Sequence, residues 1–347
     1  LRIELENIKT NKKIIDNRNN YGSQSYNGDF KKIENIKFKK LSNINQLNYY
    51  PIFMDDGIIF FENKGTIIKY SENNKILWKN NYYSKLEKKL FPKIYFLKDN
   101  QNLIVADTIS KFYSIDINTG NLNWSKNNSY PFNSDIKKHN NKFFVIDYKN
   151  TLRCYFINDG SECWNVQTEG SFTLSNTKTS LIIVEDKVIF NNSVGEITAV
   201  NIESGMLLWQ LPTQNSNIIY ETYNFKTSEL VADGNSIYFS NNKDQFYSID
   251  LNSGSINWIN KINSNFPPII IENLIFTISN EGFLFVIEKS NGKIIRITDA
   301  YKQYKTKNRS QIKPIGFSIG NKNLYLTNSD GKIIIIDLSL GDIIKTE

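Results

Sequence analysis

The sequence has very few of the residues that build metal sites and nucleophilic active sites. His139 is the only histidine among 347 residues, and Cys154 and Cys163 are the only cysteines. This excludes a metal site rich in histidine, and a triad built on His139 would lack a nucleophile motif. We interpret His139 as a loop residue and predict no catalytic residue, no metal site and no bound cofactor.

Long apolar runs and helical periodicity are also missing. No apolar run approaches the ~18 to 20 residues that span a bilayer, and no segment keeps a helical period. The chain starts at Leu1 and shows neither a signal peptide nor a lipid-attachment cysteine, so we allow for a processed or clipped amino terminus. With 40% hydrophobic and 13% aromatic residues, the composition is typical of a globular protein without a membrane span.

The net charge of +7 is not concentrated in one basic block. Lysines are scattered among asparagine and isoleucine along the whole chain, which is typical of solvated strand edges rather than of a surface for nucleic acid. We therefore predict no nucleic-acid partner.

A degenerate repeat fills most of the chain. Its clearest copies are QFYSIDLNSGSINW at 245–258, KFYSIDINTGNLNW at 111–124, EITAVNIESGMLLW at 196–209 and TLRCYFINDGSECW at 151–164. Weaker copies end at Trp78, Arg296 and Lys345, which makes seven. The recurring positions are a glycine and a tryptophan four residues later: Gly120, Gly160, Gly205, Gly254, Gly292 and Gly341, with Trp78, Trp124, Trp164, Trp209 and Trp258.

Each copy predicts a β-hairpin. Residues 245–251 alternate as in a strand, and Asn252-Ser253-Gly254 then interrupts the alternation. Asp250 begins the turn, where its carboxylate can accept N–H groups, and glycine supplies a positive φ. Aspartate recurs at 116 and 337. Because residues at the same turn of separate repeats cannot converge on one site, we interpret these aspartates as structural and expect the tryptophans to pack between neighbouring sheets.

The spacing of the repeats predicts the fold class. From Trp78 to Trp258 the tryptophans are 46, 40, 45 and 49 residues apart, which matches the ~40 to 50 residues of a four-stranded propeller blade. A parallel β-helix would need shorter periods. We predict an all-β protein, a β-propeller of four-stranded antiparallel blades with seven visible repeats.

The chain divides into an arm and a propeller. Residues 1–32 are polar and predict an extended or poorly ordered arm, whereas residues 33–347 predict the propeller. Within it, residues 33–41 predict an orphan outer strand, and the seven repeats occupy residues 49–347. The seventh repeat has its own outer strand at 342–345, so the orphan strand has no blade of its own.

Three long connections run from an outer strand to the next inner strand, at 79–92, 210–226 and 298–313. They carry paired tyrosines among charged residues, namely Tyr82, Tyr83, Tyr220, Tyr223, Tyr301 and Tyr304. Tyrosines on loops either recognise a protein partner or pack the loop against its blade, and the sequence leaves both readings open.

The frame D-x-x-[TS]-G-x-x-x-W, as in DINTGNLNW and DLNSGSINW, resembles the repeat of the pyrroloquinoline-quinone (PQQ) type propellers over residues 49–347. An orphan outer strand, an irregular loop before Phe225 and the loss of tryptophan from the final repeats resemble the outer-membrane assembly lipoproteins of the BamB family. This resemblance implies an eight-bladed ring. We then expect a truncated last blade, with three inner strands beyond Glu347 completed by residues 36–40; the alternative is a closed ring of seven blades.

The resemblance also implies a function. It implies a non-catalytic periplasmic scaffold for the assembly of β-barrel outer-membrane proteins, tethered to the outer membrane only by a lipid anchor that is not present in this sequence. The implied partner is the barrel-inserting protein BamA, bound by its periplasmic domains through propeller loops. The candidate partner-binding residues are Phe172, Leu174, Tyr220, Tyr223, Asn224, Phe225 and Lys226. The family is typically acidic where this chain has Asn224 to Lys226, so complementary charge on the partner cannot be assumed.

The alternative function is a PQQ-type quinoprotein enzyme or a sugar-binding propeller. A quinone dehydrogenase would need a calcium site, an aspartate base and often a disulfide between adjacent cysteines, and none is evident. Cys154 and Cys163 lie on the two arms of one hairpin, where they would either form a bridge or act as small apolar side chains.

Overall fold

The computed structural model describes residues 2–5, 20–23, 51–73, 75–169, 178–213 and 225–346. These residues form seven four-stranded sheets, each contiguous in the sequence. Blades 1 to 4 are β1 (Ile52–Met54) to β4 (Ile76–Asn81), with β2 (Gly57–Glu62) and β3 (Thr66–Ser71); β5 (Ile94–Asp99), β6 (Asn102–Asp107), β7 (Lys111–Asp116) and β8 (Leu122–Asn127); β9 (Lys137–His139), β10 (Lys142–Ile146), β11 (Thr151–Phe156) and β12 (Glu162–Gln167); and β13 (Leu181–Val184), β14 (Lys187–Asn191), β15 (Glu196–Asn201) and β16 (Leu207–Pro212).

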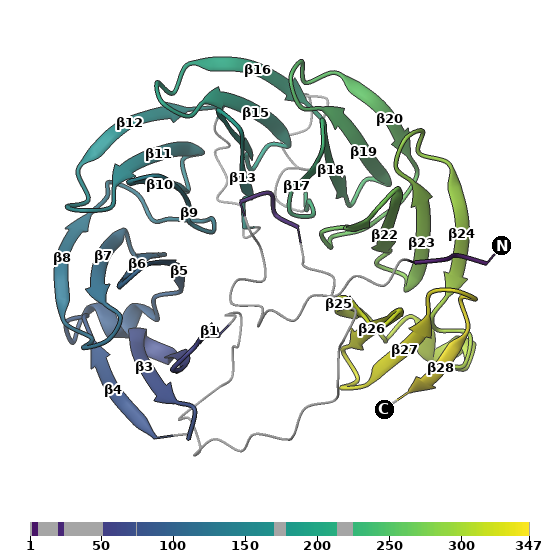
Figure 1. The fold of residues 1–347 in the computed structure, drawn as a ribbon, viewed down its shortest axis with the longest axis horizontal. Coiled ribbons are helices and arrows are strands. Elements are labelled where there is room, and N and C mark those ends of the chain that lie inside the picture. The colour runs from purple at the N-terminus through teal and green to yellow at the C-terminus, as the bar shows by residue number, and fades with distance from the viewer. Residues whose placement is uncertain are drawn as a thin grey trace.

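Blades 5 to 7 follow the same plan. They are β17 (Val231–Asp233), β18 (Ser236–Asn241), β19 (Gln245–Asp250) and β20 (Ile256–Asn260); β21 (Ile269–Ile271), β22 (Leu274–Ile278), β23 (Phe283–Glu288) and β24 (Ile294–Asp299); and β25 (Pro314–Gly320), β26 (Asn323–Asn328), β27 (Ile333–Asp337) and β28 (Ile343–Thr346). The short helices η1 (Asn63–Gly65), η2 (Glu87–Leu90) and α1 (Thr306–Arg309) lie between strands. Each blade runs from an inner to an outer strand around a common centre (Figure 1). The predicted all-β propeller is confirmed.

The predicted turn chemistry is present in the outer hairpins. Asp116 Oδ1 accepts the N–H groups of Asn118 and Thr119 at 2.9 and 2.7 Å, and Asp250 does the same for its own turn. These hydrogen bonds hold the pKa of both carboxyl groups below the ordinary value, because they favour the ionised form. The recurring aspartates are therefore structural, as predicted.

Each tryptophan packs against the next blade, where it meets the turn glycine. A Cβ on Gly254 would lie 2.5 Å from Trp209, and a Cβ on Gly120 would lie 2.8 Å from Trp78. The indole N–H of Trp209 also donates to the Leu251 carbonyl at 3.0 Å. The same packing joins Trp124 to Gly160, Trp164 to Gly205 and Trp258 to Gly292. Trp78 and Trp209 are buried and the other three are half-buried.

Arg296 takes the tryptophan's place between blades 6 and 7. Its guanidinium donates to the carbonyl groups of Ser339, at 3.0 Å, and Leu338, and it lies against Gly341. Leu338 follows the turn aspartate just as Leu251 does, so arginine reaches the same backbone acceptor that the indole uses elsewhere. Loss of tryptophan from this repeat therefore leaves the contact in place.

A bulge recurs between the third and fourth strands of every blade. In blade 2, Ser114 pairs with Trp124 but Ile115 pairs with Leu122, so one outer residue has no partner in the register. The same shift occurs at the equivalent position of the other blades. Such a bulge increases the local twist, which turns the outer edge of each blade.

The core is divided among the contacts between blades. Six hydrophobic clusters each join two consecutive blades, from blades 1 and 2 to blades 6 and 7. Within the ranges given above, none of the clusters joins blade 7 to blade 1, and Figure 1 shows the described blades as an open arc. The orphan strand at 33–41 lies outside the described residues, so its role in closing the ring stays a prediction.

Two parts of the amino-terminal arm are described, residues 2–5 and 20–23, and both contact the blades. Ile3 and Leu5 are buried in the cluster between blades 6 and 7, and the Ile3 N–H donates to the Ser339 carbonyl at 3.0 Å. Asn20 and Tyr21 accept N–H groups from β13 and β17, respectively, at 2.8 Å each. Among the described residues, no helix is long and apolar enough to cross a membrane.

Candidate functional site

The strand order places the loops on two faces. The outer-to-inner connections share one face with the turns between second and third strands, because neighbouring strands are antiparallel. The hairpin turns with aspartate and glycine lie on the other. We call the first the connection face. It carries the three long connections of the sequence, which here run between β4 and β5, β16 and β17, and β24 and β25, and a fourth of similar length between β12 and β13.

The tyrosines of the first and third connections pack their loops against blades. Tyr83 is buried and donates to Asp107 Oδ2 at 2.6 Å, and Tyr301 is buried and donates to Asn328 Oδ1 at 2.7 Å. Tyr82 and Tyr304 are half-buried and donate to Gly120 and Asp330. These four tyrosines therefore pack their loops against the blades and are not displayed to a partner. Tyr220 and Tyr223 lie outside the described residues.

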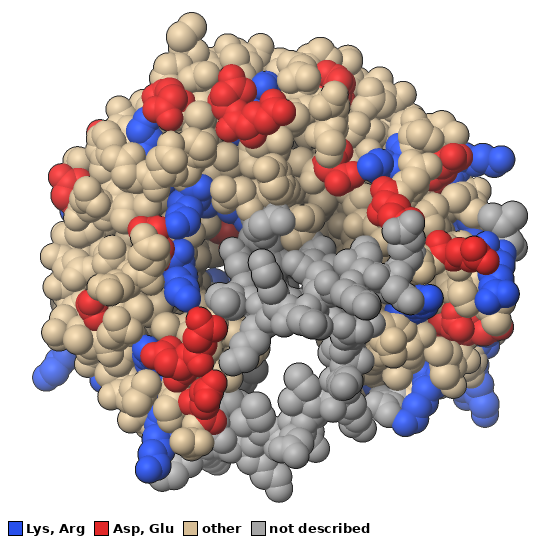
Figure 2. All heavy atoms as spheres, viewed as in Figure 1, with Lys and Arg blue, Asp and Glu red and all other residues tan. Residues whose placement is uncertain are grey.

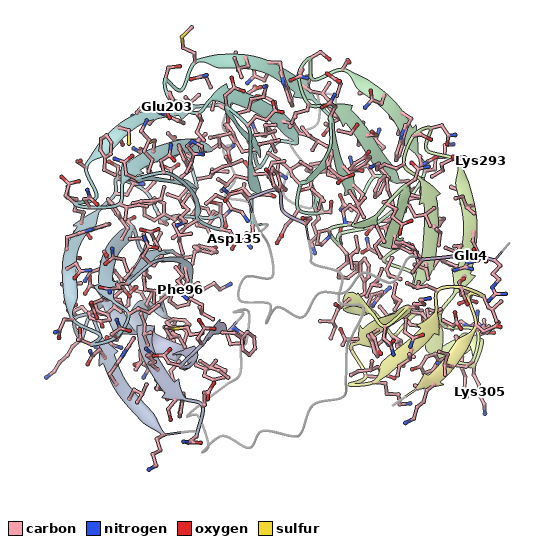
Figure 3. The ribbon with its side chains drawn as sticks, in the orientation of Figure 1. Glu4, Phe96, Asp135, Glu203, Lys293 and Lys305 are labelled. Atoms are coloured by element: carbon pink, nitrogen blue, oxygen red, sulfur yellow. The ribbon has the colours of Figure 1, made fainter. Side chains whose placement is uncertain are left out.

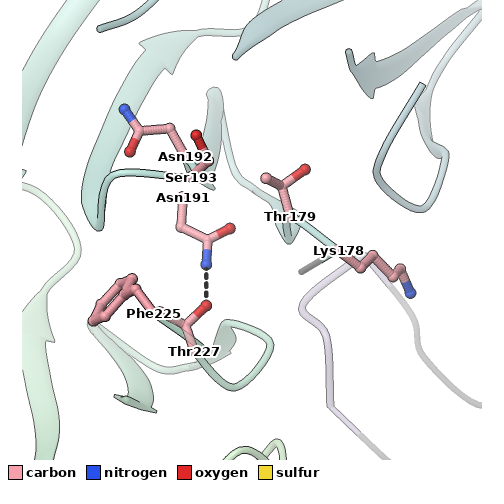
Figure 4. A pocket seen from close by; sticks show the side chains of 7 residues that line it. All are labelled: Lys178, Thr179, Asn191, Asn192, Ser193, Phe225 and Thr227. Carbon is pink, nitrogen blue, oxygen red and sulfur yellow. Dashed lines mark hydrogen bonds between the residues drawn. The ribbon is translucent and has the colours of Figure 1, made fainter. Parts of the chain in front are cut away.

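A pocket opens on the connection face where blades 4 and 5 meet. The empty space between its walls is about 210 Å³, and this volume includes the part that is open to solvent. Its lining combines the start of blade 4, the turn after β14 and the approach to β17 (Figure 4): Lys178, Thr179, Asn191, Asn192, Ser193, Phe225 and Thr227.

The pocket lies where both candidate binding loops end. Lys178 follows residues 170–177, which contain Phe172 and Leu174, and Phe225 follows residues 214–224, which contain Tyr220, Tyr223 and Asn224. Those five residues lie outside the described ranges. Phe225 is only 3% exposed and forms part of the pocket wall. Lys226 is exposed, and its backbone N–H donates to Asn242 at 3.0 Å.

Hydrogen bonds between blades fix the walls of the pocket. Asn191 accepts the Ser180 N–H at 2.6 Å and donates to Thr227 Oγ1 at 2.7 Å, so one amide links the approaches to β13 and β17. The Thr179 hydroxyl donates to the Asn133 carbonyl of the preceding blade at 2.9 Å. Since these groups are buried or half-buried, their hydrogen bonds hold blades 3, 4 and 5 in one arrangement.

One lysine joins three blades at the rim of the pocket. Lys178 Nζ lies 2.5 Å from Asp135 of blade 3 and 3.3 Å from Glu229 of blade 5. Figure 3 shows Asp135 on the inner side of the ring. Over the visible face, positive and negative side chains are interspersed (Figure 2), in line with the expectation of solvated edges rather than one basic surface.

Groups that could serve catalysis are scarce among the described residues. Within those ranges, no group of three or more His, Cys, Asp or Glu side chains could hold a metal ion. His139 is the last residue of β9, paired in register with Lys142. The expectation that His139 lies in a loop is thus wrong. The strand β9 has only three residues, KKH, and a segment so short and rich in lysine shows no strand pattern in the sequence.

The two cysteines lie on the paired strands β11 and β12 and are unbridged. Burial raises the pKa of the Cys154 thiol far above its ordinary value, and burial also raises the pKa of Cys163. Burial thus disfavours the reactive thiolate, which fits the reading of both cysteines as small apolar side chains.

Seven four-stranded blades, joined by a tryptophan or by Arg296 packed against a turn glycine, define a propeller built from PQQ-like repeats. The chain belongs to the family of the outer membrane protein assembly factor BamB, whose family model matches residues 53–298. An uncharacterized protein of Rickettsia prowazekii (strain Madrid E) is 22% identical over 263 residues. That match covers 72% of this chain but 61% of the relative, so it spans about three fifths of the relative's length.

Solved structures share the fold at low sequence identity. BamB from Moraxella catarrhalis superimposes with a TM-score of 0.69 at 16% identity, covering 86% of this chain and 87% of that one. A europium-containing methanol dehydrogenase superimposes with a TM-score of 0.64 at 9% identity, covering 86% and 77%. At these identities the likeness extends to the fold alone, and the same fold serves scaffolds and enzymes.

Proposed function

We propose that this protein is a non-catalytic scaffold for the assembly of β-barrel outer-membrane proteins, and that it binds the periplasmic domains of a BamA-like barrel-inserting protein. Family membership supports the process. The observation that carries the binding site is the pocket at blades 4 and 5, where the ends of both candidate loops meet. In this proposal the protein works in the periplasm, tethered to the outer membrane by a lipid anchor.

The physical basis of the binding is a fixed arrangement of the residues at the ends of the two candidate loops. Hydrogen bonds from Asn191 and Thr179 hold the base of both loops, so little ordering entropy is lost there on binding. The apolar side chains Phe172, Leu174, Tyr220 and Tyr223 supply the anchors of the interface, since aromatic and large apolar residues commonly dominate binding energy. Exposed Lys226 favours an acidic surface on the partner.

Site-specific photocrosslinking in cells tests this proposal. A photoreactive residue at Lys226 or Ser193 would lie on the connection face beside the pocket, whereas one at Asn252 would lie at the exposed hairpin turn of blade 5 on the opposite face. We expect the first two positions to crosslink the barrel-inserting protein and the third to give no such product. Equal crosslinking from all three positions, or none from the first two, would contradict the proposed surface.

A quinoprotein enzyme is the second candidate, because a methanol dehydrogenase shares this fold. The purified protein can be incubated with pyrroloquinoline quinone and calcium, and then assayed for reduction of a dye with alcohol and sugar substrates. A scaffold gives no turnover and no quinone absorbance after desalting. Substrate-dependent dye reduction would overturn the scaffold proposal.

A further inference from the structure

The connection between β4 and β5 carries three of the most exposed large apolar side chains of the described residues. Leu86 is 74% exposed, Leu90 is 64% exposed and Phe91 is 59% exposed. They lie within six residues of one another, around the helix η2. Isolated exposed apolar residues are ordinary, but a contiguous group on one projecting loop indicates a contact surface.

Lysines surround this apolar group. Lys85, Lys88, Lys89 and Lys93 flank the three side chains, and Lys64 lies over the Phe91 ring at 5.7 Å. Within the described ranges, none of the four flanking lysines takes part in a recorded ion pair. The segment therefore presents uncompensated positive charge beside exposed apolar side chains.

The acidic residue within this segment is already engaged. Glu87 accepts the Ser84 N–H at 2.6 Å and lies 3.4 Å from Lys111 Nζ. The Ser84 hydrogen bond, followed by weaker contributions that include Lys111, holds the pKa of Glu87 below its ordinary value. Its charge is thus balanced within the blade and does not offset the lysines at the tip.

The base of the loop is fixed while its tip projects. Tyr83 is bound to Asp107, and Lys111 Nζ donates to the Tyr82 carbonyl at 2.8 Å. Phe91 adopts a φ of +50°, a left-handed conformation that bulky residues seldom take, and buried Pro92 follows it. Phe91 therefore combines backbone strain with an exposed ring, and strained residues of this kind cluster at sites of function.

We propose that this loop, residues 84–93, is a contact site for an anionic phospholipid surface. Leucine and phenylalanine enter the boundary between headgroups and acyl chains, while lysines attract the anionic headgroups. Each lysine near such a surface increases affinity about fivefold. A lipid surface fits better than a protein groove, because lysines stand on both sides of the exposed apolar side chains along the loop.

This proposal goes beyond the scaffold function and does not depend on it. The loop lies on the connection face, as does the pocket at blades 4 and 5. Contact with a bilayer would therefore bring that face toward the membrane in which a barrel-inserting partner resides. A second exposed apolar group, Met206 to Leu208 in and beside β16, has no lysine within it and serves as a natural control.

Vesicle cosedimentation tests the proposal. We expect the protein to bind vesicles of phosphatidylglycerol and phosphatidylethanolamine, to bind phosphatidylcholine vesicles much less, and to lose binding in high salt. The variant L86S/L90S/F91S should weaken binding at least about tenfold, since three apolar side chains no longer enter the bilayer. The charge variant K88E/K89E should weaken it at least as much. Unchanged unfolding midpoints show that both variants fold.

Matched control variants distinguish binding by this loop from nonspecific binding by other exposed apolar or basic side chains. M206S/L207S/L208S removes a second exposed apolar group, and K261E/K293E reverses two exposed lysines elsewhere. Both variants should bind like the unaltered protein. Failure to prefer anionic vesicles, or equal binding by all four variants, would overturn the proposal. The unaltered protein could also fail to bind vesicles and sediment as a dimer, with L86S/L90S/F91S sedimenting as a monomer. In that case a second copy of the protein covers the loop and the proposal is wrong.

Discussion

Single side chains fasten each blade to the next. The turn glycine has no Cβ because the preceding blade's tryptophan occupies that space, and the indole N–H of four of these tryptophans donates to a carbonyl of the same turn. Arg296 reaches the equivalent carbonyl between blades 6 and 7. The glycine thus has two roles: it adopts a left-handed turn conformation, and it leaves space for an aromatic ring. Comparison with a glycine that has only the first role separates them.

Replacement of Gly254 by alanine should destabilise the protein more than replacement of Gly234. Both glycines have positive φ, +72° and +56°, but a Cβ at 254 would lie 2.5 Å from Trp209, whereas one at 234 would meet nothing within 4 Å. Urea unfolding should show a loss of about 1 to 2 kcal/mol for G234A from backbone strain. G254A should lose about 1 to 3 kcal/mol more from overpacking. Equal losses would show that Trp209 moves aside freely.

Asp107 should make stability depend on pH in an unusual direction. Burial raises its pKa from 3.8 to about 6 despite hydrogen bonds from Tyr83 and backbone N–H groups. The folded state then holds the proton more tightly than the unfolded state, so this group stabilises below pH ~4 and loses that contribution as pH rises to ~6. Two pKa units correspond to about 3 kcal/mol.

The variant D107N isolates this contribution. Asn328 already accepts the hydroxyl of Tyr301 at the equivalent place in blade 7, so an amide is compatible with the turn. We expect the stability of the unaltered protein relative to D107N to fall between pH 4 and 6 in urea titrations. A difference that stays constant, or grows with pH, would mean that Asp107 is ionised at a normal pKa.

The hairpins and the spacing of the blades could be predicted from sequence, because alternation, aspartate, glycine and tryptophan recur at fixed offsets. The turns between second and third strands contain another recurring feature, which the sequence analysis does not include. Asp107, Asp147, Asn192 and Asn241 each follow or end a second strand and accept two N–H groups of the next turn. Sequences such as NLIVAD and KFFVID contain that signal.

The pocket could not be predicted in the same way. Lys178, Thr179 and Thr227 belong to connections that differ from blade to blade, so no repeat marks them, and only the closed geometry of blades 3 to 5 brings them together. For the tyrosines of the first and third connections, the sequence could not decide between display and packing, for a physical reason. Tyrosine has both an apolar ring and a hydroxyl, so the same residue suits display and packing, and Asp107 and Asn328 supply buried acceptors for Tyr83 and Tyr301.

The order of the blades makes protection uneven across the molecule. Blade 4 packs on both sides, through separate clusters with blades 3 and 5. Blade 1 is joined, in the described part of the chain, to blade 2 alone, while blade 7 also receives Ile3 and Leu5. Within blade 4, local opening costs least at the outer strand β16, because most of its side chains are exposed, whereas those of β14 and β15 are mostly buried.

Hydrogen exchange followed by mass spectrometry measures this difference. Amides in β16 should exchange about tenfold or more faster than those in β14 and β15. Equal protection would show that β16 opens only together with the rest of its blade.

The central claim is that this propeller is a binding scaffold whose connection face at blades 4 and 5 docks a barrel-inserting protein. Isothermal titration calorimetry with the purified periplasmic domains of the cognate partner tests it most directly. The account predicts saturable one-to-one binding, weakened about a hundredfold or more by F172A/L174A/Y220A/Y223A and unchanged by N252A on the opposite face. Absence of binding, or equal affinity for the combined variant and the unaltered protein, would contradict it.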